Sequence, residues 1–192
     1  MKKPPASRVP TPKAALQSDH ESWHNGCDIE IGFYARSLHY AAKKLIATLD
    51  LIPNPKTAWD ACPVVLLYRE ATELHLKALV DQGGNFLKSP TDHITLAKTH
   101  SLRFLAQIVC QIIKAVKWEA EFKSEGISSL ADFSALVDEL GSLDPVAVAK
   151  RPGERRAVGS VPDKLLPPNV VRFAKRLDGL LDLLAATAGA GG

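Results

Sequence analysis

The chain has 192 residues, of which 46% are hydrophobic and 23% are charged, values typical of one globular domain with tails. No apolar run approaches the roughly 18 residues that a membrane-spanning helix needs. The net charge of +3 comes from residues 1–20, because the basic and acidic residues of the remaining chain balance each other. A strongly basic nucleic-acid-binding body is therefore excluded.

The N-terminus and the cysteines indicate the compartment. MKKPPASRVPTPK begins with basic residues but has no apolar stretch after them, so we do not expect a secretory signal peptide. Cys27, Cys62 and Cys110 are far apart and form no CxxC pair. An odd, scattered set of cysteines is typical of a reducing compartment. We therefore expect a cytoplasmic protein.

The first 50 residues divide into a tail and a helix. Residues 1–26 hold four prolines and few large apolar side chains, which predicts a flexible, basic tail. Helical periodicity begins near Ile29, and the helix that it predicts ends before Pro53. Apolar residues spaced by three and four form one face of this helix: Leu38, Ala41, Ala42, Leu45 and Leu49.

Two further helices follow in the middle of the chain. We expect one from Pro63, which suits a first helical turn, to Gln82, because Gly83 and Gly84 then stop it. The next opens after the sequence THS at 99–101, where a threonine or serine hydroxyl can cap the free amides. Its apolar stripe consists of Leu102, Leu105, Val109, Ile112 and Val116.

The last two helices complete the predicted fold. Ser129 and Asp132 resemble a capping box and begin a helix that ends before Gly141. The final helix follows the prolines at 167–168 and ends in a run of small residues. Because no segment alternates with period two, the sequence predicts an all-α, antiparallel bundle of about five helices. We expect the bundle to span 27–187, with 188–192 as a frayed C-terminus.

Two segments carry a resemblance to a known family. LLYREATELHLKALVDQGG contains an A-x-E-x-x-x-K-A-L pattern, and KTHSLRFLAQIV contains H-S-L. Both patterns, in this order and separated by a polar loop, resemble HEPN domains (higher eukaryotes and prokaryotes nucleotide-binding). The matching residues are Ala71, Glu73, Lys77, Ala78 and Leu79 in the first segment, and His100, Ser101 and Leu102 in the second. The likeness spans roughly residues 28–187.

The resemblance implies a helical bundle, often a homodimer, that cleaves RNA or binds nucleotides in microbial defence or toxin–antitoxin systems. Some members carry an R-Y-P segment before the last helix, where this chain has Arg151 followed by Pro152. Ribonuclease members use an arginine and a histidine separated by four to six residues, usually in the later helices. All six histidines of this chain lie at or before residue 100.

Arg69 and His75 are the pair in this chain with that spacing. On a helix, their side chains lie roughly 120° apart, so a shared site needs a second subunit or a loop. His75 would move the 2′-hydroxyl proton of RNA while Arg69 stabilised the phosphate charge. The alternative interpretation makes His75 a histidine at the edge of the core.

Glu73 and Lys77 also allow two interpretations. Their spacing of four residues suits a surface ion pair, which contributes only about 0.3–0.5 kcal/mol. The family resemblance instead implies a polar groove in which both residues face His100 at the start of the next helix. The sequence leaves these alternatives open.

Two other groups of residues are candidates for binding. The loop before the last helix has a local positive charge, and we expect it to contact RNA phosphates through Lys150, Arg151, Arg155 and Arg156. His20, His24 and Cys27 have zinc-ligand spacing if helical, but no second cluster supplies a fourth ligand, so we expect no metal site. No nucleotide-binding or hydrolase motif of the Walker, GxGxxG or GxSxG type occurs, and we expect no cofactor.

These observations favour a HEPN-like protein that binds RNA or a nucleotide as a homodimer, without membrane association. One alternative is a metal-independent endoribonuclease toxin that uses Arg69 and His75. Another is a non-enzymatic module that binds a partner protein such as an antitoxin.

Overall fold

The computed structural model describes residues 12–49, 62–83, 86–87, 98–143 and 167–189. Side chains are described from Ile31 onward within these ranges, except those of 167–168 and 188–189.

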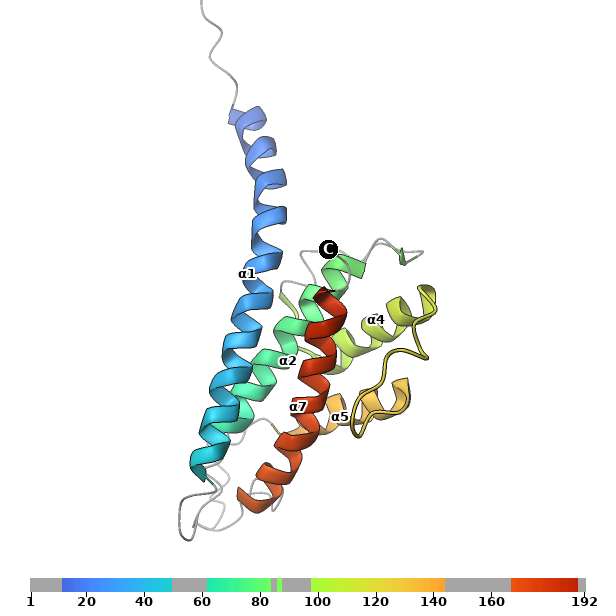
Figure 1. Ribbon diagram of the computed structural model, residues 1–192. Coiled ribbons are helices and arrows are strands. Elements are labelled where there is room, and N and C mark those ends of the chain that lie inside the picture. The colour runs from blue at the N-terminus through green and yellow to red at the C-terminus, as the bar shows by residue number, and fades with distance from the viewer. Residues whose placement is uncertain (1–11, 50–61, 84–85, 88–97, 144–166, 190–192) are drawn as a thin grey trace, which may run out of the picture.

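The described residues form an all-α bundle, as predicted (Figure 1). Its helices are α1 (Pro12–Leu49), α2 (Cys62–Gly83), α4 (Leu102–Ala115), α5 (Leu130–Ser142) and α7 (Pro167–Gly189). In the described ranges the β structure is limited to an isolated bridge between Ser124 and Ile127. None of the described helices combines the length and the apolar character needed to cross a membrane.

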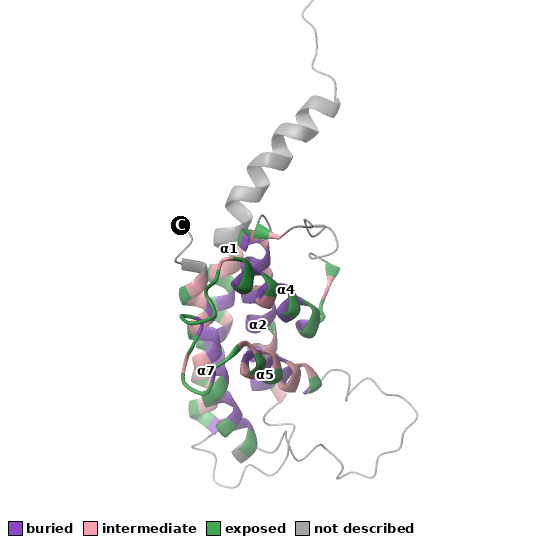
Figure 2. Ribbon diagram, turned by 90° about the vertical axis from the view of Figure 1, so that its right-hand side faces the viewer, coloured by how far each residue is buried: buried purple, intermediate pink, exposed green. Residues whose placement is uncertain are grey.

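Helix α2 occupies the middle of the bundle. It packs against α1, α4 and α7 and also touches α5. Consecutive helices α1 and α2 run in opposite directions, and α7 lies beside both of them (Figure 1). The buried positions concentrate on the faces that these helices turn toward one another (Figure 2). Apolar residues from α2, α4, α5 and α7 therefore share one core.

Helix α1 begins earlier than the periodicity predicted. It starts at Pro12 rather than near Ile29, so residues 12–26 of the expected flexible tail are helical, while 1–11 lie outside the described residues. Proline is tolerated in the first turn of a helix, and no further proline interrupts the segment before Leu49. A helix also needs no buried face to continue past its bundle, and α1 extends well beyond the other helices (Figure 1).

The predicted serine caps begin α4 and α5. The hydroxyl of Ser101 accepts a hydrogen bond from the amide of Phe104 at 3.3 Å, which satisfies one free amide of α4. Ser129 accepts from the amide of Asp132 at 3.1 Å. Hydrogen bonds from Ser128 and then Ser129 lower the pKa of the Asp132 carboxyl. Both helix starts therefore lie where the sequence indicated.

The core position of Leu105 gives a stability prediction. Its side chain is fully buried in the core, so Leu105→Ala should lower the free energy of unfolding by about 2–5 kcal/mol through lost burial and an unfilled cavity. Gln107→Ala, on the exposed side of the same helix, serves as the control and should stay within about 0.5 kcal/mol of wild type. Urea denaturation measures both changes. Equal stability of the two variants would contradict this packing.

Candidate functional site

Glu73 of α2 contacts the segment that precedes α4. Its carboxylate is buried, and one oxygen, Oε1, lies 2.8 Å from Lys77 Nζ and 2.9 Å from His100 Nδ1. Lys77 is itself largely buried, whereas the His100 side chain is 75% exposed. The contact differs from an ordinary surface ion pair, because the carboxylate is almost completely shielded from water and also contacts His100 from outside α2.

The contact with Glu73 sets the orientation of the His100 ring. A carboxylate beside Nδ1 accepts a hydrogen bond from that nitrogen, so neutral His100 carries its proton on Nδ1 and leaves Nε2 with a lone pair. The exposed ring can therefore accept a proton at Nε2 while Glu73 holds the opposite side. A carboxylate–histidine pair of this kind suits general base chemistry.

Arg69 and His100 line one cavity of about 420 Å³ at the start of α4. Arg69 donates a hydrogen bond from Nη1 to the carbonyl oxygen of Gly141 at 3.3 Å, which links α2 to α5. Arg103 also lines the cavity and binds Asp138 through two parallel hydrogen bonds of 2.9 and 3.0 Å. The first amides of α4 add the partial positive charge of a helix N-terminus. The guanidinium groups of Arg69 and Arg103 and the N-terminus of α4 therefore bring positive charge to one cavity.

His75 lies in a different part of the bundle from this cavity. Its side chain is buried with 1% exposure, and neither ring nitrogen has a hydrogen-bond partner among the described residues. Burial lowers the pKa of His75 to about 4, with additional lowering from His39 and Arg36 and an opposing effect from Asp182. These charges belong to α1 and α7. The structure therefore does not bring Arg69 and His75 together within one chain.

A polar network that the sequence interpretation missed connects α1, α2 and α7. Asp178 Oδ1 lies 2.8 Å from His39 Nε2 and accepts a hydrogen bond from the Tyr68 hydroxyl, also at 2.8 Å. The rings of His39 and Tyr68 are 5.9 Å apart. One helical turn further along, Lys43 Nζ lies 3.4 Å from Asp182 Oδ2. Three helices therefore meet through a half-buried carboxylate.

The electrostatics of this network follow from its partial burial. Burial favours a neutral Asp178, but hydrogen bonds from His39 and Tyr68 together with the charge of Lys43 outweigh that effect and lower its pKa. Burial, and then the hydrogen bond to Asp178, raise the pKa of Tyr68 well above its ordinary value. Asp178 thus stays ionised as an acceptor, while Tyr68 stays protonated as a donor.

The remaining predicted site residues lie outside the described parts. They are the loop residues Lys150, Arg151, Arg155 and Arg156, and the side chains of His20, His24 and Cys27. Among the side chains that are described, no group of three or more His, Cys, Asp or Glu is arranged to hold a metal ion.

Comparisons with known proteins found no relative of this chain. No family model, curated protein or solved structure matches the chain. Function therefore has to be inferred from the geometry around Glu73 and from the motif residues themselves.

The burial of His75 predicts an acid-sensitive fold. Because its pKa is lowered to about 4 from 6.5, the unfolded chain binds the proton more readily between these values, and stability should fall as pH drops through this window. His75→Leu removes this contribution and two unpaired buried nitrogen atoms, so its stability should depend less on pH below about 6.5.

Chemical denaturation at pH 4.5, 5.5, 7 and 9 measures this effect. Neither protein takes up or releases a proton at position 75 between pH 7 and 9. The difference in the free energy of unfolding between wild type and His75→Leu should therefore be constant there. A parallel decline of both proteins from pH 7 to 4.5 would show that other groups control acid stability.

Proposed function

We propose that this chain is a HEPN-like protein that binds RNA or a nucleotide, with a phosphate held at the cavity of Arg69 and His100. The observation that carries the proposal is the convergence of Arg69, His100 and Arg103 on one cavity at the N-terminus of α4. Of the motif residues that resemble HEPN domains, His100, Ser101 and Leu102 line this cavity, and Glu73 contacts His100.

The chemistry of the cavity suits a phosphate group. A guanidinium has five N–H donors in a planar fork that matches phosphate oxygens, and the bond from Arg69 Nη1 to Gly141 holds this group at the cavity. Free amides at a helix N-terminus favour an anion for the same electrostatic reason. Asp138 already pairs with Arg103, so a phosphate has to compete for that side chain, and Arg69 and His100 are the main ligands in our proposal.

The size of the cavity agrees with a nucleotide. Its volume of about 420 Å³ lies within the range of about 300–1,000 Å³ typical of small-molecule sites. An RNA strand that places one phosphate here has to continue across the protein surface. In our proposal the basic loop residues Lys150, Arg151, Arg155 and Arg156 provide additional, sequence-independent phosphate contacts.

A metal-independent endoribonuclease is the second candidate function, and the Glu73–His100 contact favours it. In this alternative Nε2 of His100 takes the proton of the RNA 2′-hydroxyl, and Arg69 stabilises the negative charge on the attacked phosphate. His100 then replaces His75 as the base, because His75 is buried and belongs to a different side of α2.

We also propose that the chain assembles with a second copy of itself or with a partner protein. Three large aromatic residues on α1, Phe33, Tyr34 and Tyr40, are each more than 60% exposed, which supports a contact with a second copy or with an antitoxin-like partner. Ile108 of α4 is buried within the single chain and is not part of such a contact. The biological setting that we propose is cytoplasmic microbial defence or a toxin–antitoxin system.

Light scattering tests the homodimer. At micromolar concentration the full chain should have about twice its monomer mass of 20.8 kDa. Replacing Tyr34 and Tyr40 together by serine removes exposed aromatic surface without opening the core, so it should shift the mass toward that of a monomer. A wild-type mass of one chain would exclude the homodimer.

Phosphate binding is tested with a labelled single-stranded RNA. Arg69→Ala and His100→Ala should each weaken binding, Arg69→Ala by about 10- to 100-fold, because a hydrogen bond to a charged group contributes about 1.5–3 kcal/mol. Lys114→Ala removes the same charge at the exposed opposite end of α4 and should change affinity little. The double variant Arg155→Ala with Arg156→Ala should weaken binding and reduce its salt dependence.

Fluorescence anisotropy at several salt concentrations measures these affinities. Equal effects of Arg69→Ala and Lys114→Ala would mean that binding depends on overall charge rather than on this cavity. If wild type binds neither RNA nor free nucleotides, the interaction-module alternative replaces both nucleic-acid functions.

Cleavage of an RNA panel in the presence of a chelator distinguishes the binding protein from the ribonuclease. If the chain cleaves RNA, His100→Ala should reduce the rate at least about 100-fold, whereas His75→Leu should leave it unchanged. Loss of cleavage in His75→Leu with a normal melting temperature would restore the Arg69–His75 pair as the active site. Absence of cleavage by wild type would exclude the enzyme.

A further inference from the structure

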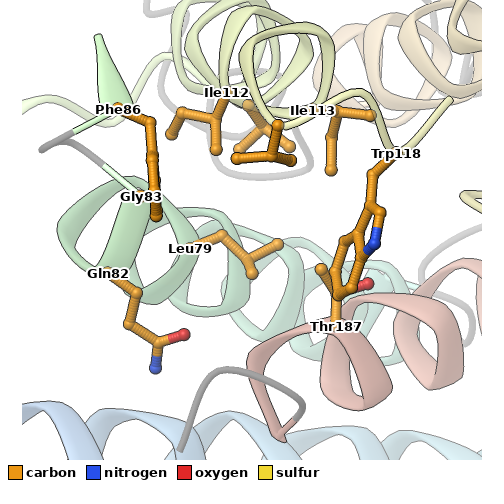
Figure 3. Close-up of a pocket in the computed structure, with 10 residues that line it drawn as sticks. Leu79, Gln82, Gly83, Phe86, Ile112, Ile113, Trp118 and Thr187 are labelled. Atoms are coloured by element: carbon orange, nitrogen blue, oxygen red, sulfur yellow. The ribbon is translucent and has the colours of Figure 1, made fainter.

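A second cavity, of about 360 Å³, lies toward the other end of α4 (Figure 3). This partly open cavity is lined by the last turns of α2, the second half of α4 and the end of α7, with Phe86 and Trp118 from the adjoining loops. None of its lining residues belongs to the Arg69–His100 cavity. It is therefore a separate feature, and a ligand bound in it would be independent of the proposed phosphate site.

Two aromatic side chains flank this cavity from opposite sides. Figure 3 shows Phe86 and Trp118 facing each other across the open space, with Leu79 and Ile112 between them. Phe86 is 62% exposed and Trp118 is 37% exposed, so neither ring is used to fill the core of the bundle. Rings held apart in this way present apolar surface to a molecule that enters between them.

The lining specifies the charge of such a molecule. It contains no charged side chain, and its polar side-chain groups are the amide of Gln82, the hydroxyl of Thr187 and the indole N–H of Trp118. A charged ligand would lose hydration without gaining an ion pair, whereas a neutral ligand with one polar atom loses little. The cavity thus favours a neutral, mainly apolar compound.

The volume of the cavity and the close packing at Gly83 determine the size of the ligand. An apolar cavity of roughly 150 Å³ holds one benzene molecule, and this cavity is more than twice as large. A fused two-ring system is therefore the appropriate scale. The space is preserved by Gly83, because a Cβ atom there would lie only 2.5 Å from Cγ2 of Ile112 and would displace that side chain.

We infer that this cavity binds a neutral, planar, two-ring aromatic molecule between Phe86 and Trp118. The two aromatic rings contact the ligand, and Leu79 and Ile112 form the apolar surface between them. The hydroxyl oxygen of Thr187, whose hydrogen is donated to the carbonyl of Leu183, or the amide oxygen of Gln82 accepts a hydrogen bond from an N–H of the ligand at the edge of the cavity.

Indole, a neutral two-ring aromatic compound with one N–H, is the probe for the test. Titration calorimetry and ligand-observed NMR with the full-length chain should show one site per chain. Phe86→Ala and Trp118→Ala should each weaken indole binding by about 10-fold, since each removes an aromatic contact. Indole-3-acetate should bind at least about 10-fold more weakly than indole, because the lining offers no partner for its carboxylate.

Phe104→Ala is the matched control. Phe104 is a partly exposed aromatic residue of α4 that does not line this cavity, so its replacement should leave indole affinity unchanged. Circular dichroism melting of all three variants should match wild type. A wild type that does not bind indole, or equal affinities in all three variants, would overturn the inference.

Light scattering distinguishes the ligand site from a surface covered by a second copy. If Phe86→Ala and Trp118→Ala shift a wild-type dimer to the monomer, the two rings belong to a protein interface and the inference is wrong. The ligand site requires an unchanged mass in both variants.

Discussion

The burial of α2 in the middle of the bundle is the constraint on which the rest of the structure depends. This helix carries charged and polar residues along its length, yet neighbouring helices cover it on several sides. A buried charge is costly unless it is paired. Glu73 meets this requirement with Lys77 from its own helix and His100 from the start of α4, and the buried, neutral Tyr68 donates its hydroxyl hydrogen to Asp178 of α7. The polar residues of α2 therefore help to fix the positions of its neighbours.

His75 shows the cost of this arrangement. It is as deeply buried as the apolar residues around it, but the described residues provide no hydrogen bond to either ring nitrogen. The uncharged form is the one compatible with that environment, which agrees with its lowered pKa. A general base has to exchange protons with substrate, so a histidine in this position is poorly suited to catalysis, while the exposed His100 ring held by Glu73 is better suited.

The helices could be predicted from the sequence because their signals are local. Serine caps, flanking prolines and apolar residues at three- and four-residue spacing gave the starts of α4 and α5 and the extent of α2. The pairing of Glu73 with Lys77 is local as well. The contact between His39 and Asp178 joins residues 139 positions apart, so no spacing rule reveals it. The available signals were His39 with Lys43 and Asp178 with Asp182, two polar pairs spaced by four residues on helices that pack together.

The distinction between local contacts and contacts made by the tertiary fold also separates the two possible partners of Arg69. A pair formed with His75 would lie on one helix with the two side chains pointing in different directions, and the packing of α2 buries the His75 ring. A pair formed with His100 exists only while α4 is docked on α2, and the buried carboxylate of Glu73 is the contact that joins them. Loss of that carboxylate would remove the ion pair that Glu73 forms with the largely buried Lys77 and would release the His100 ring. In this fold the stability of the α2–α4 contact and the geometry of the proposed phosphate site are therefore controlled by the same residue.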